Sequence, residues 1–461
     1  MIKTNKNMKQ LITTLIALAG FAFQAFANDF QSGDLLYTII SIDPPCVSLD
    51  GHIDGQAAQG ELFIPGIVEF NNITYTVKEI GSRAFYGCIN LTGDLVVPET
   101  ITRIGSRAFY RCGFSGSLIL PNTLKEIGRF AFCTNRLTGQ LVLPDSLYKI
   151  EPGAFTGSEG FTGDLVIPES VTMIGDSAFR LCSFDGHLYF GEGLKRIGEM
   201  AFCQCSNLKG DLVIPESVEG IGQYAFYQCG FEGHLSLSSR LTVIEDATFA
   251  WCDGLTGGLV LPENLTRIGW QAFVECGFTG DLVIPNTVEW IGSEAFCNCQ
   301  QITNLTIGGA VERIEYIAFA GIPLESIKLH AETPPSLHYL TFANVPKDIP
   351  VYIPCHTIEL YQNAEYWNEF ANFIEDCSLS TDKLFIDGDE VTCYPNPTTN
   401  HLKINGVYPS EIQIYNLLGQ LMKTVHNTNE VNVSDLDEGV YLVSVSDGNR
   451  IYKTERITII N

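Results

Sequence analysis

Three residues whose side chains could bind a metal or titrate near neutral pH occupy one position in successive copies of a repeated motif. They are His187, Asp211 and His234. Neutral imidazole and carboxylate both bind divalent metals, so this column could hold a metal ion or make ligand binding depend on pH. Solvated side chains explain the same column, and we favour that interpretation over a metal site.

The sequence carries no catalytic signature. It has no H-E-x-x-H motif, no Gly-rich phosphate loop and no zinc-ribbon spacing of cysteines. A Ser-His-Asp triad stays open as an alternative, because its members need not be close in the chain. We predict a protein that is not an enzyme and that uses no cofactor.

The fifteen cysteines follow the repeat rather than a disulfide framework. Most lie three residues or one residue after a repeated phenylalanine. These are Cys88, Cys112, Cys182, Cys205, Cys229, Cys252, Cys276 and Cys299, and then Cys133, Cys203 and Cys297. Because buried free cysteine packs as a small hydrophobe, we predict a column of buried thiols. The distance between neighbouring coils would also permit some disulfide bonds. The same slots account for the two C-x-C pairs, which could otherwise bind a soft metal.

One frame organises most of the chain. Ile followed five residues later by Phe recurs eleven times, 23 or 24 residues apart. In a typical copy, Leu165–Ile167 alternate faces as a strand does, and Pro168 ends the pairing because it has no N–H. A second extended piece ends at Ile174, and "GDSAF" is predicted to pack Ala and Phe inward on a helical turn. A glycine later in each copy permits a tight turn or a positive φ.

A single copy cannot fold alone. It buries about six apolar side chains, which do not offset the backbone entropy lost in ordering 23 residues. Stacking covers both open faces of each coil and pairs its strands with two neighbours. The repeats are therefore predicted to form a solenoid.

The frame L-x-x-x-L-x-(V/I)-P-x-x-(V/L)-x-x-I-G-x-x-A-F-x-x-C resembles the BspA-like family of bacterial leucine-rich repeats over about residues 60–346. The resemblance implies an α/β solenoid, a curved right-handed array with a parallel β-sheet and short helical turns. It also implies surface adhesion and binding rather than catalysis. The copies depart from the family in an extra residue at "TGD", and the eleventh copy lacks the glycine and the proline.

The two ends of the repeat array carry different patterns. "VEFNNITYTVKEIG" alternates around Asn71-Asn72 and predicts a β-hairpin cap. After the last coil, a strand and an amphipathic helix are predicted, with a core stripe of Leu360, Tyr361, Ala364, Trp367 and Phe370. A disulfide between Cys355 and Cys377, at the two ends of this cap, is left open.

The last 70 residues or so form a different unit. The pieces Tyr394-Pro395-Asn396-Pro397, Tyr415 to Gly419-Gln420 and Gly439-Val440-Tyr441 resemble the C-terminal sorting domain of type IX secretion substrates, a small all-β sandwich. That family implies export across the outer membrane, removal of this domain and attachment to the cell surface. An ordinary immunoglobulin-like binding module is the alternative. Cys393, beside the motif, has no assigned role.

The net charge and the N-terminal segment restrict the possible partners and the location of the protein. The net charge of −26 argues against nucleic acid and against anionic membrane surfaces. Residues 1–27 have three lysines, an apolar run and Ala25-Phe26-Ala27, which together predict a signal peptide rather than a longer membrane anchor. We predict a secreted or cell-surface protein of a Gram-negative bacterium, with no membrane span.

The predicted domains are a signal peptide at 1–27, an N-terminal cap at 28–79, the solenoid at 80–346, a C-terminal cap at 347–378, a linker at 379–390 and the β-sandwich at 391–461.

The outward face of the strands is the predicted binding site. The residue between the two inward positions of each strand forms an apolar stripe, and the residue two places earlier forms an acid-rich one. Contiguous exposed apolar surface often marks a binding site, although β-branched residues also simply favour strands. The predicted ligand-binding residues are Val142, Asp164, Val166, His187, Tyr189, Asp211, Val213 and His234. The acids just after each proline, such as Glu99, Glu169 and Glu216, are predicted to form a solvated edge.

Three functions fit this pattern. The leading hypothesis is an adhesin-like protein that binds a host or microbial surface protein or glycan, with the outer-membrane secretion machinery as a second partner of the C-terminal domain. A structural surface-layer component is the alternative. A carbohydrate-active β-helix enzyme is a weaker third, because the outward columns are poor in basic residues.

Overall fold

The computed structural model describes residues 29–379, 392–405, 409, 411–416, 420–426, 428–446 and 451–460. The predicted signal peptide lies outside these residues, and so does nearly all of the predicted linker. No helix within these ranges is long and apolar enough to cross a membrane. The chain divides into two compact units, one that runs to Leu305 and adds 311–325 and 336–346, and one of 306–310, 326–335 and 347–461.

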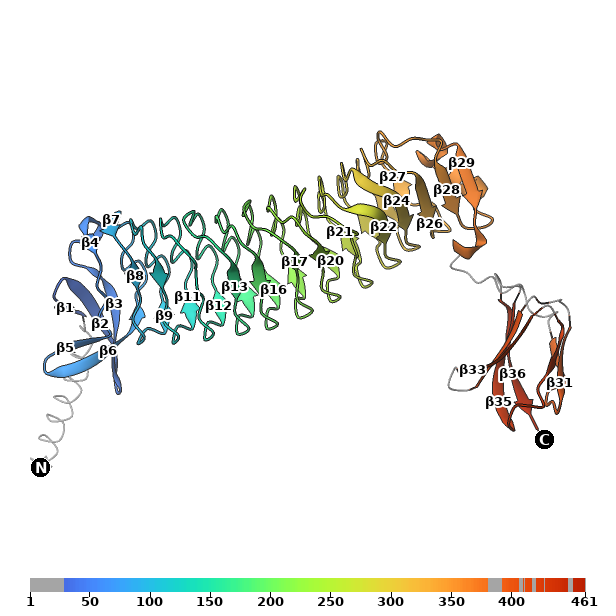
Figure 1. Ribbon diagram of the computed structural model, residues 1–461, viewed down its shortest axis with the longest axis horizontal. Helices are drawn as coiled ribbons and strands as arrows, with labels where there is room; N and C mark the ends of the chain where they lie inside the picture. Colours follow the sequence, from blue (N-terminus) through green and yellow to red (C-terminus); the bar gives the residue numbers. More distant parts are fainter. Residues whose placement is uncertain are drawn as a thin grey trace, which may run out of the picture. The chain divides into compact units, whose positions relative to one another are not determined.

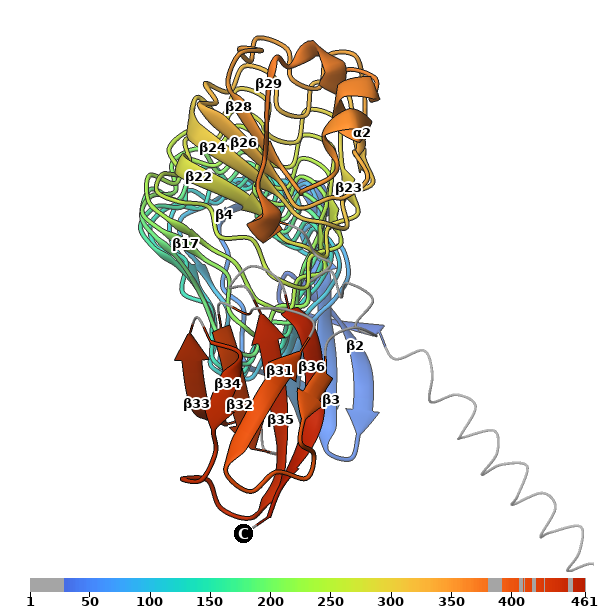
Figure 2. The ribbon, with the colours of Figure 1, turned by 90° about the vertical axis from the view of Figure 1, so that its right-hand side faces the viewer.

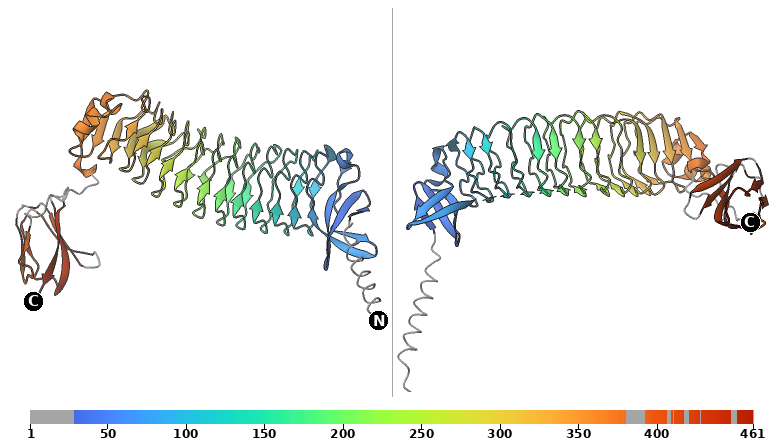
Figure 3. Two further views of the ribbon diagram at one scale, coloured as in Figure 1. Left: turned by 180° about the vertical axis from the view of Figure 1, so that it is seen from behind. Right: turned by 60° about the horizontal axis from the view of Figure 1, so that its bottom comes forward.

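Each coil contributes a short strand that ends at the repeated Ile position, and most coils contribute a second one at the Leu-x-(Val/Ile) segment. The coils of the first unit follow one another in sequence order (Figures 1 and 3). The first set, the Ile row, ends in the repeated Ile. It comprises β9 (Arg103–Ile104), β11 (Glu126–Ile127), β12 (Lys149–Ile150), β14 (Met173–Ile174), β16 (Arg196–Ile197), β18 (Gly220–Ile221), β20 (Val243–Ile244), β21 (Arg267–Ile268), β23 (Trp290–Ile291), β25 (Arg313–Ile314) and β27 (Ser336–Leu337). Its strands pair in parallel with Ile opposite Ile, in one sheet that ends at β18 and a second that runs from β20 to β27, where Ile314 lies opposite Leu337. The copies therefore stack in register.

The second set, the Leu row, holds the Leu-x-(Val/Ile) segments. It comprises β8 (Leu95–Val96), β10 (Leu118–Ile119), β13 (Leu165–Ile167), β15 (Leu188–Phe190), β17 (Leu212–Val213), β19 (Leu235–Ser236), β22 (Thr279–Ile284) and β24 (Gln301–Ile307). Within it, β8 pairs with β10, β13 with β15, and β17 with β19, all in parallel. β22 is hydrogen-bonded to β24 in a further sheet. Its outward residues are the predicted binding surface.

A continuous column of phenylalanines fills the centre of the coils, which lie one behind another when viewed along the stack (Figure 2). The rings of Phe179 and Phe202 are 5.4 Å apart and tilted by only 9°, and the same stacking recurs from Phe85 onward. The column extends one copy further than the sequence frame indicated, because Phe342 stacks on Phe319 at 5.5 Å. In that extra copy, Leu337 takes the place of Ile and Thr341 takes the place of Ala.

The turn after the repeated Ile is not helical. In each of the eleven coils, the third and seventh residues after the Ile have positive φ, and most of them are not glycine. In the coil that follows Ile174, these are Ser177 (φ 55°) and Leu181 (φ 59°). Ser177, Phe179 and Leu181 donate their N–H groups to carbonyls of the next coil at 2.7–3.0 Å. The prediction of helical turns is therefore corrected, because alternate N–H groups bond to the neighbouring coil instead of continuing a helix.

The protein therefore has little helix, and the predicted α/β class is correct for the strands but overstates the helical part. Among the described residues, the helical segments are α2 (Ile358–Asn363) and three single-turn 3₁₀ helices, η1 (Gly55–Ala57), η2 (Trp367–Glu369) and η3 (Cys377–Leu379). The solenoid of parallel strands agrees with the prediction, and so does the all-β C-terminal part.

The N-terminal end continues the Ile row into a mixed sheet. Its strands are β1 (Asp29–Ser32), β2 (Leu35–Ile42), β3 (Pro45–His52), β5 (Ile67–Phe70) and β6 (Ile73–Ile80), with β4 (Gln59–Glu61) and β7 (Asn90–Thr92) paired beside them. β3 and β6 pair in parallel, whereas β1 with β2, β2 with β3 and β5 with β6 are antiparallel pairs. β5 and β6 form a hairpin in which Asn71 and Asn72 both have positive φ. Leu49 pairs with Ile80, and Ile80 pairs with Ile104, so the sheet covers the open end of the first coil.

In the second unit, a parallel ladder of β26 (Ser326–Leu329), β28 (Pro350–Ile353) and β29 (Asn372–Glu375) carries the cap. Tyr361 and Trp367 are fully buried and donate hydrogen bonds to main-chain carbonyls at 2.6 and 2.8 Å. Leu360 is 53 % exposed, so it does not belong to the predicted core stripe. The stripe assumed one continuous helix, whereas the helix ends at Asn363 and the main chain is extended at Ala364.

Cys355 and Cys377 form the disulfide that the sequence left open, with their Cα atoms 4.8 Å apart. Beyond the cap, the same unit contains two antiparallel sheets, which Figure 1 shows as two layers. They consist of β30 (Thr392–Tyr394), β31 (His401–Asn405) and β34 (Glu430–Asn432), and of β32 (Glu411–Asn416), β33 (Leu421–His426), β35 (Gly439–Ser446) and β36 (Ile451–Ile459).

Candidate binding surface

The apolar column predicted to bind ligand lies exposed along the Leu row. Val166 is 50 % exposed, while both of its neighbours in β13 are buried. It pairs across to Tyr189, which is 51 % exposed, and Val142 and Val213 are exposed to 66 % and 53 %. The strand alternation thus places half-exposed apolar side chains on successive coils.

Four of the eight predicted residues line one shallow depression of about 450 Å³. They are His187, Tyr189, Asp211 and Val213, and Glu192 lies beside them. The rings of His187 and Tyr189 are 6.0 Å apart. The other four predicted residues, Val142, Asp164, Val166 and His234, are not among the lining residues of this depression.

The predicted acid–histidine column consists of separate pairs that link adjacent coils. Asp211 Oδ1 accepts the N–H of His234 at 2.7 Å and lies 3.4 Å from its Nδ1. Asp164 makes the same two contacts with His187 at 2.8 and 3.4 Å. The N–H bond from His234, with its nearby imidazole, holds the pKa of Asp211 below its usual value. Gly233 is required here, since a Cβ would lie 2.2 Å from Asp211 Oδ1.

The cysteines of the repeat slot donate hydrogen bonds as well as filling space. Cys229 Sγ donates to Phe202 O at 3.1 Å, and Cys252 Sγ donates to Phe226 O at 3.0 Å, each in the preceding coil. Ser158 occupies the same slot, and its hydroxyl donates to a phenylalanine carbonyl in the same way. Burial raises the pKa of Cys252 to about 12.

The prediction of buried free thiols in the repeat is confirmed. This includes both C-x-C pairs, whose four cysteines are buried in the core. Over the ranges that the structure describes, no three His, Cys, Asp or Glu side chains are grouped so that they could hold a metal ion.

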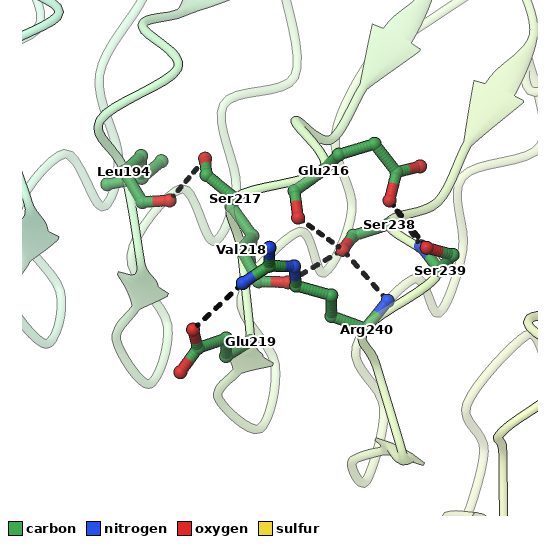
Figure 4. Close-up of polar contacts among 8 residues, drawn as sticks. All are labelled: Leu194, Glu216, Ser217, Val218, Glu219, Ser238, Ser239 and Arg240. Atoms are coloured by element: carbon green, nitrogen blue, oxygen red, sulfur yellow. Dashed lines mark hydrogen bonds and ion pairs between the residues drawn. The ribbon is translucent and has the colours of Figure 1, made fainter.

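The acids after each proline have a structural role that the sequence reading missed. The carboxylate of Glu216 accepts the N–H and the hydroxyl of Ser239 at 3.0 and 2.7 Å (Figure 4). The hydroxyl bond, followed by the N–H bond, lowers the pKa of Glu216. Glu99 and Glu169 accept N–H groups of the next coil at 3.2 and 2.8 Å. The solvated edge is therefore also a ladder between coils.

The hydroxyl residue that follows these acids forms a second ladder in the opposite direction. Ser170 Oγ donates to Leu147 O at 2.6 Å, and Ser217 Oγ donates to Leu194 O at 2.7 Å. Ser238, at the place that proline holds in neighbouring coils, also donates to the preceding coil, to Val218 O at 2.7 Å (Figure 4). Within one copy of the repeat, such residues show no partner. The signal becomes visible only when copies are aligned, because each bond joins residues about one repeat apart.

In the C-terminal sandwich, the predicted motif docks on the last strand. Asn396 Nδ2 donates to Arg456 O at 2.9 Å, and Asn396 Oδ1 accepts the N–H of Thr458 at 2.9 Å. Cys393 is buried in the core of the sandwich beside Leu402 and Ile404. This gives the cysteine next to the motif a packing role.

Two family models match the chain. Residues 66–185, 184–280, 234–347 and 266–371 match the BspA type leucine rich repeat region, in six copies. Residues 392–460 match the secretion system C-terminal sorting domain.

One curated relative, the ulvan lyase NLR42 of Nonlabens ulvanivorans, is 33 % identical over 98 residues, which is 20 % of this chain. The match spans 17 % of that protein's length and does not establish catalysis here.

Solved structures with a similar fold are leucine-rich repeat and surface proteins. A leucine rich cell surface protein of Faecalibacterium prausnitzii is 21 % identical, with a TM-score of 0.42, covering 65 % of this chain and 94 % of that one. A leucine-rich repeat protein of Bacteroides ovatus is 20 % identical with a TM-score of 0.36, covering 75 % and 99 %. The pneumococcal vaccine antigen PcpA is 19 % identical with a TM-score of 0.42, covering 76 % and 98 %.

Proposed function

The chain belongs to the BspA-type leucine-rich repeat proteins and ends in a secretion-system sorting domain, and from this premise we propose that it is a non-enzymatic, adhesin-like binding protein. The sorting domain indicates secretion or display at the cell surface. In the proposal, cleavage after Ala27 and removal of residues 391–461 leave a capped solenoid outside the cell. Its partner is a surface protein or glycan of a host or of another microbe.

The observation that carries this proposal is the depression around Tyr189. An aromatic ring, an exposed valine, an imidazole and a carboxylate meet there on rigid, hydrogen-bonded strands. Tyrosine with a few convergent polar groups is typical of recognition sites. Full burial of such an apolar side chain is worth about 1.5–3 kcal/mol, so each half-exposed member of the stripe has about 1 kcal/mol to gain from a partner.

A triple variant tests the strand face. Val166→Ser, Tyr189→Ser and Val213→Ser remove the apolar surface without adding charge, and Ser236 already occupies this column. The matched control changes Val96, Val260 and Val283 to Ser, in the same column but outside the depression. Binding of the mature protein to a panel of matrix proteins and glycans should fall in the first variant and persist in the control. Unchanged binding by the first variant, with its folding intact, would contradict the proposed site.

Self-assembly into a surface layer is the second candidate. The apolar stripe continues beyond the depression at Val96, Ile119, Val260 and Val283, which are all about half exposed or more, and such a stripe could pair with a second copy. Sedimentation of the mature protein separates the two functions. Concentration-dependent association that both triple variants weaken would favour the surface-layer function over ligand binding.

A further inference from the structure

The turns of the first three coils carry an unusual concentration of positive charge. Residues 82–88, 106–112 and 129–135 hold four arginines and no Asp or Glu, in a chain whose net charge is −26. The corresponding turns of two later coils, 270–276 and 293–299, hold Glu275 and Glu294 and no Lys or Arg. The charge of this edge is therefore position-specific and is not a property of the repeat.

The backbone fixes where these arginines stand. Arg83, Arg107 and Phe130 occupy the same place in successive coils, with φ of 62°, 56° and 53°. Each donates its N–H to a carbonyl of the next coil, at 2.9, 2.8 and 3.0 Å. Because this main chain is hydrogen-bonded from coil to coil, it is ordered before any ligand binds, and binding has to order only the side chains.

Aromatic rings lie beside the arginines. Tyr86 and Tyr110 stack with their centroids 5.0 Å apart and their planes 6° from parallel. The Arg107 guanidinium lies 5.4 Å from the centre of the Phe130 ring. These four residues line a depression of about 390 Å³ together with Arg83 and Cys133.

Arg83 and Arg107 differ from other arginines of the coils in their ion pairing. Elsewhere on the coils, arginine faces carboxylate at 3.4–3.5 Å, as Arg240 faces Glu219 and Arg267 faces Asp246. Within the described part of the chain, no carboxylate lies within ion-pair distance of Arg83 or Arg107. Two like charges on adjacent coils repel each other, and an anion placed between them would relieve that repulsion.

We propose that this depression, here called the arginine–tyrosine site, binds an anionic sugar residue of an acidic polysaccharide. Guanidinium recognises planar carboxylate and sulfate-like oxygens through paired hydrogen bonds. The tyrosine rings offer apolar faces to the C–H side of a sugar ring, and their hydroxyls can both donate to and accept from its hydroxyl groups. The volume is at the small end of the range for ligand pockets, which suits one sugar unit. This site is separate from the strand face and stands whether or not that face binds a ligand.

The test uses the mature chain and four defined probes. Polygalacturonate presents carboxylates, dextran sulfate presents sulfates, neutral dextran presents no charge and poly-glutamate presents an acidic peptide. Titration calorimetry should detect binding to polygalacturonate, to dextran sulfate or to both, and none to dextran. Which of the two binds identifies the anion, and binding should weaken as ionic strength rises.

Two variants locate the binding. Arg83→Gln with Arg107→Gln should weaken it by at least about tenfold, since two charge-assisted hydrogen bonds are lost. Gln is compatible with the left-handed backbone, because Gln271 holds the same place with φ 52°. The control, Arg240→Gln with Arg267→Gln, removes equal charge elsewhere and should change affinity by less than about twofold.

A second pair separates sugar recognition from simple charge attraction. Tyr86→Thr with Tyr110→Thr keeps every arginine, and Thr156 already fills this column. It should weaken polysaccharide binding while leaving the salt dependence unchanged. The proposal is overturned if neither acidic polysaccharide binds, if the arginine control loses as much affinity as the arginine variant, or if the tyrosine variant binds normally. Equal or tighter binding of poly-glutamate would overturn it in favour of an acidic-peptide site.

Discussion

Asn135 offers a direct test of how polar bonds join the coils. It fills the slot that cysteine or serine fills in neighbouring coils, and it is 3 % exposed. Its Nδ2 donates to Phe109 O at 2.9 Å, and its Oδ1 accepts the N–H of Cys112 at 3.1 Å. Both partners belong to the preceding coil, so one buried amide bridges two coils.

Asn135→Leu keeps the size of the side chain and removes both bonds. The lost bond to Phe109 O is worth about 1 kcal/mol, and the buried N–H of Cys112, left without its acceptor, costs about 1–3 kcal/mol. We therefore expect unfolding to become easier by about 2–4 kcal/mol. Asn135→Cys should cost less than about 1 kcal/mol, because a thiol here can replace both bonds. It can donate to Phe109 O as the Cys182 thiol does to Phe155 O at 3.2 Å, and its sulfur can accept the N–H of Cys112 as the Cys205 sulfur accepts that of Cys182.

Urea unfolding followed by circular dichroism measures the global effect, and amide hydrogen exchange measures its location. Since each coil of a repeat array contacts only its neighbours, exchange should accelerate around Phe109 and Cys112 and stay unchanged near Phe273. The reasoning is refuted if the Leu and Cys variants are equally stable. It is also refuted if exchange rises evenly along the whole solenoid.

Three further predictions concern the buried thiols, the disulfide of the cap and the Asp211–His234 pair. Burial raises the pKa of Cys205 and Cys252 to about 12, so these thiols should react with Ellman's reagent only after unfolding, and rapid labelling of the native protein would contradict this. Replacing Cys355 and Cys377 with Ser removes a disulfide that joins residues 22 positions apart, and it should destabilise the cap by about 3 kcal/mol because the unfolded chain gains entropy. Unchanged protease resistance of the cap would contradict this prediction. Asp211 has a lowered pKa in the folded state, so its contribution is present above the ordinary value of 3.8 and is lost as pH falls through the lower folded value. The Asp211→Asn variant should therefore melt at a lower temperature than the native protein near neutral pH and at the same temperature in strong acid. A difference that persists in acid would contradict a stabilising role for the ionised Asp211 carboxylate.

The apolar skeleton could be predicted from sequence because it obeys a strict period. The Ile and Phe of each copy are buried and stack on their equivalents in the next copy, as Phe179 does on Phe202. The period failed only where residue types changed. Leu337 and Phe342 form one more coil, but the expected Ile and Ala before that Phe are Leu and Thr, so the pattern was not recognised.

The backbone of the turns could not be predicted, because its conformation depends on the neighbouring coil. "GDSAF" has the composition of a helical turn, yet Ser177 and Leu181 are left-handed. Each such residue costs about 1–2 kcal/mol. The three N–H bonds that this geometry directs to the next coil return about 0.5–1.5 kcal/mol each, so the conformation is favourable only in the stacked array.

For the candidate sites, the sequence predicts which side chains point outward but not which of them lie together, because that also depends on the neighbouring coil. Alternation along a strand placed Val166 and Tyr189 outside correctly. Which residues share a depression depends on the lateral neighbours, and these brought Asp211 beside Tyr189 but left Val142 apart. The arginine–tyrosine site gave no signal within one copy, because Arg83 and Arg107 form a cluster only after stacking.

Polar ladders and apolar columns have different roles in specifying this surface. Stacked phenylalanines tolerate small shifts between coils, because dispersion contacts are not directional. Bonds such as Ser217 to Leu194 and Asp211 to His234 have fixed partners and so fix the register of each coil. Outward positions such as that of Tyr189 take part in neither and can change at little cost in stability. A fixed register with freely variable outward residues lets one scaffold carry a different ligand site on each group of coils, as we propose for the strand-face depression and the arginine–tyrosine site.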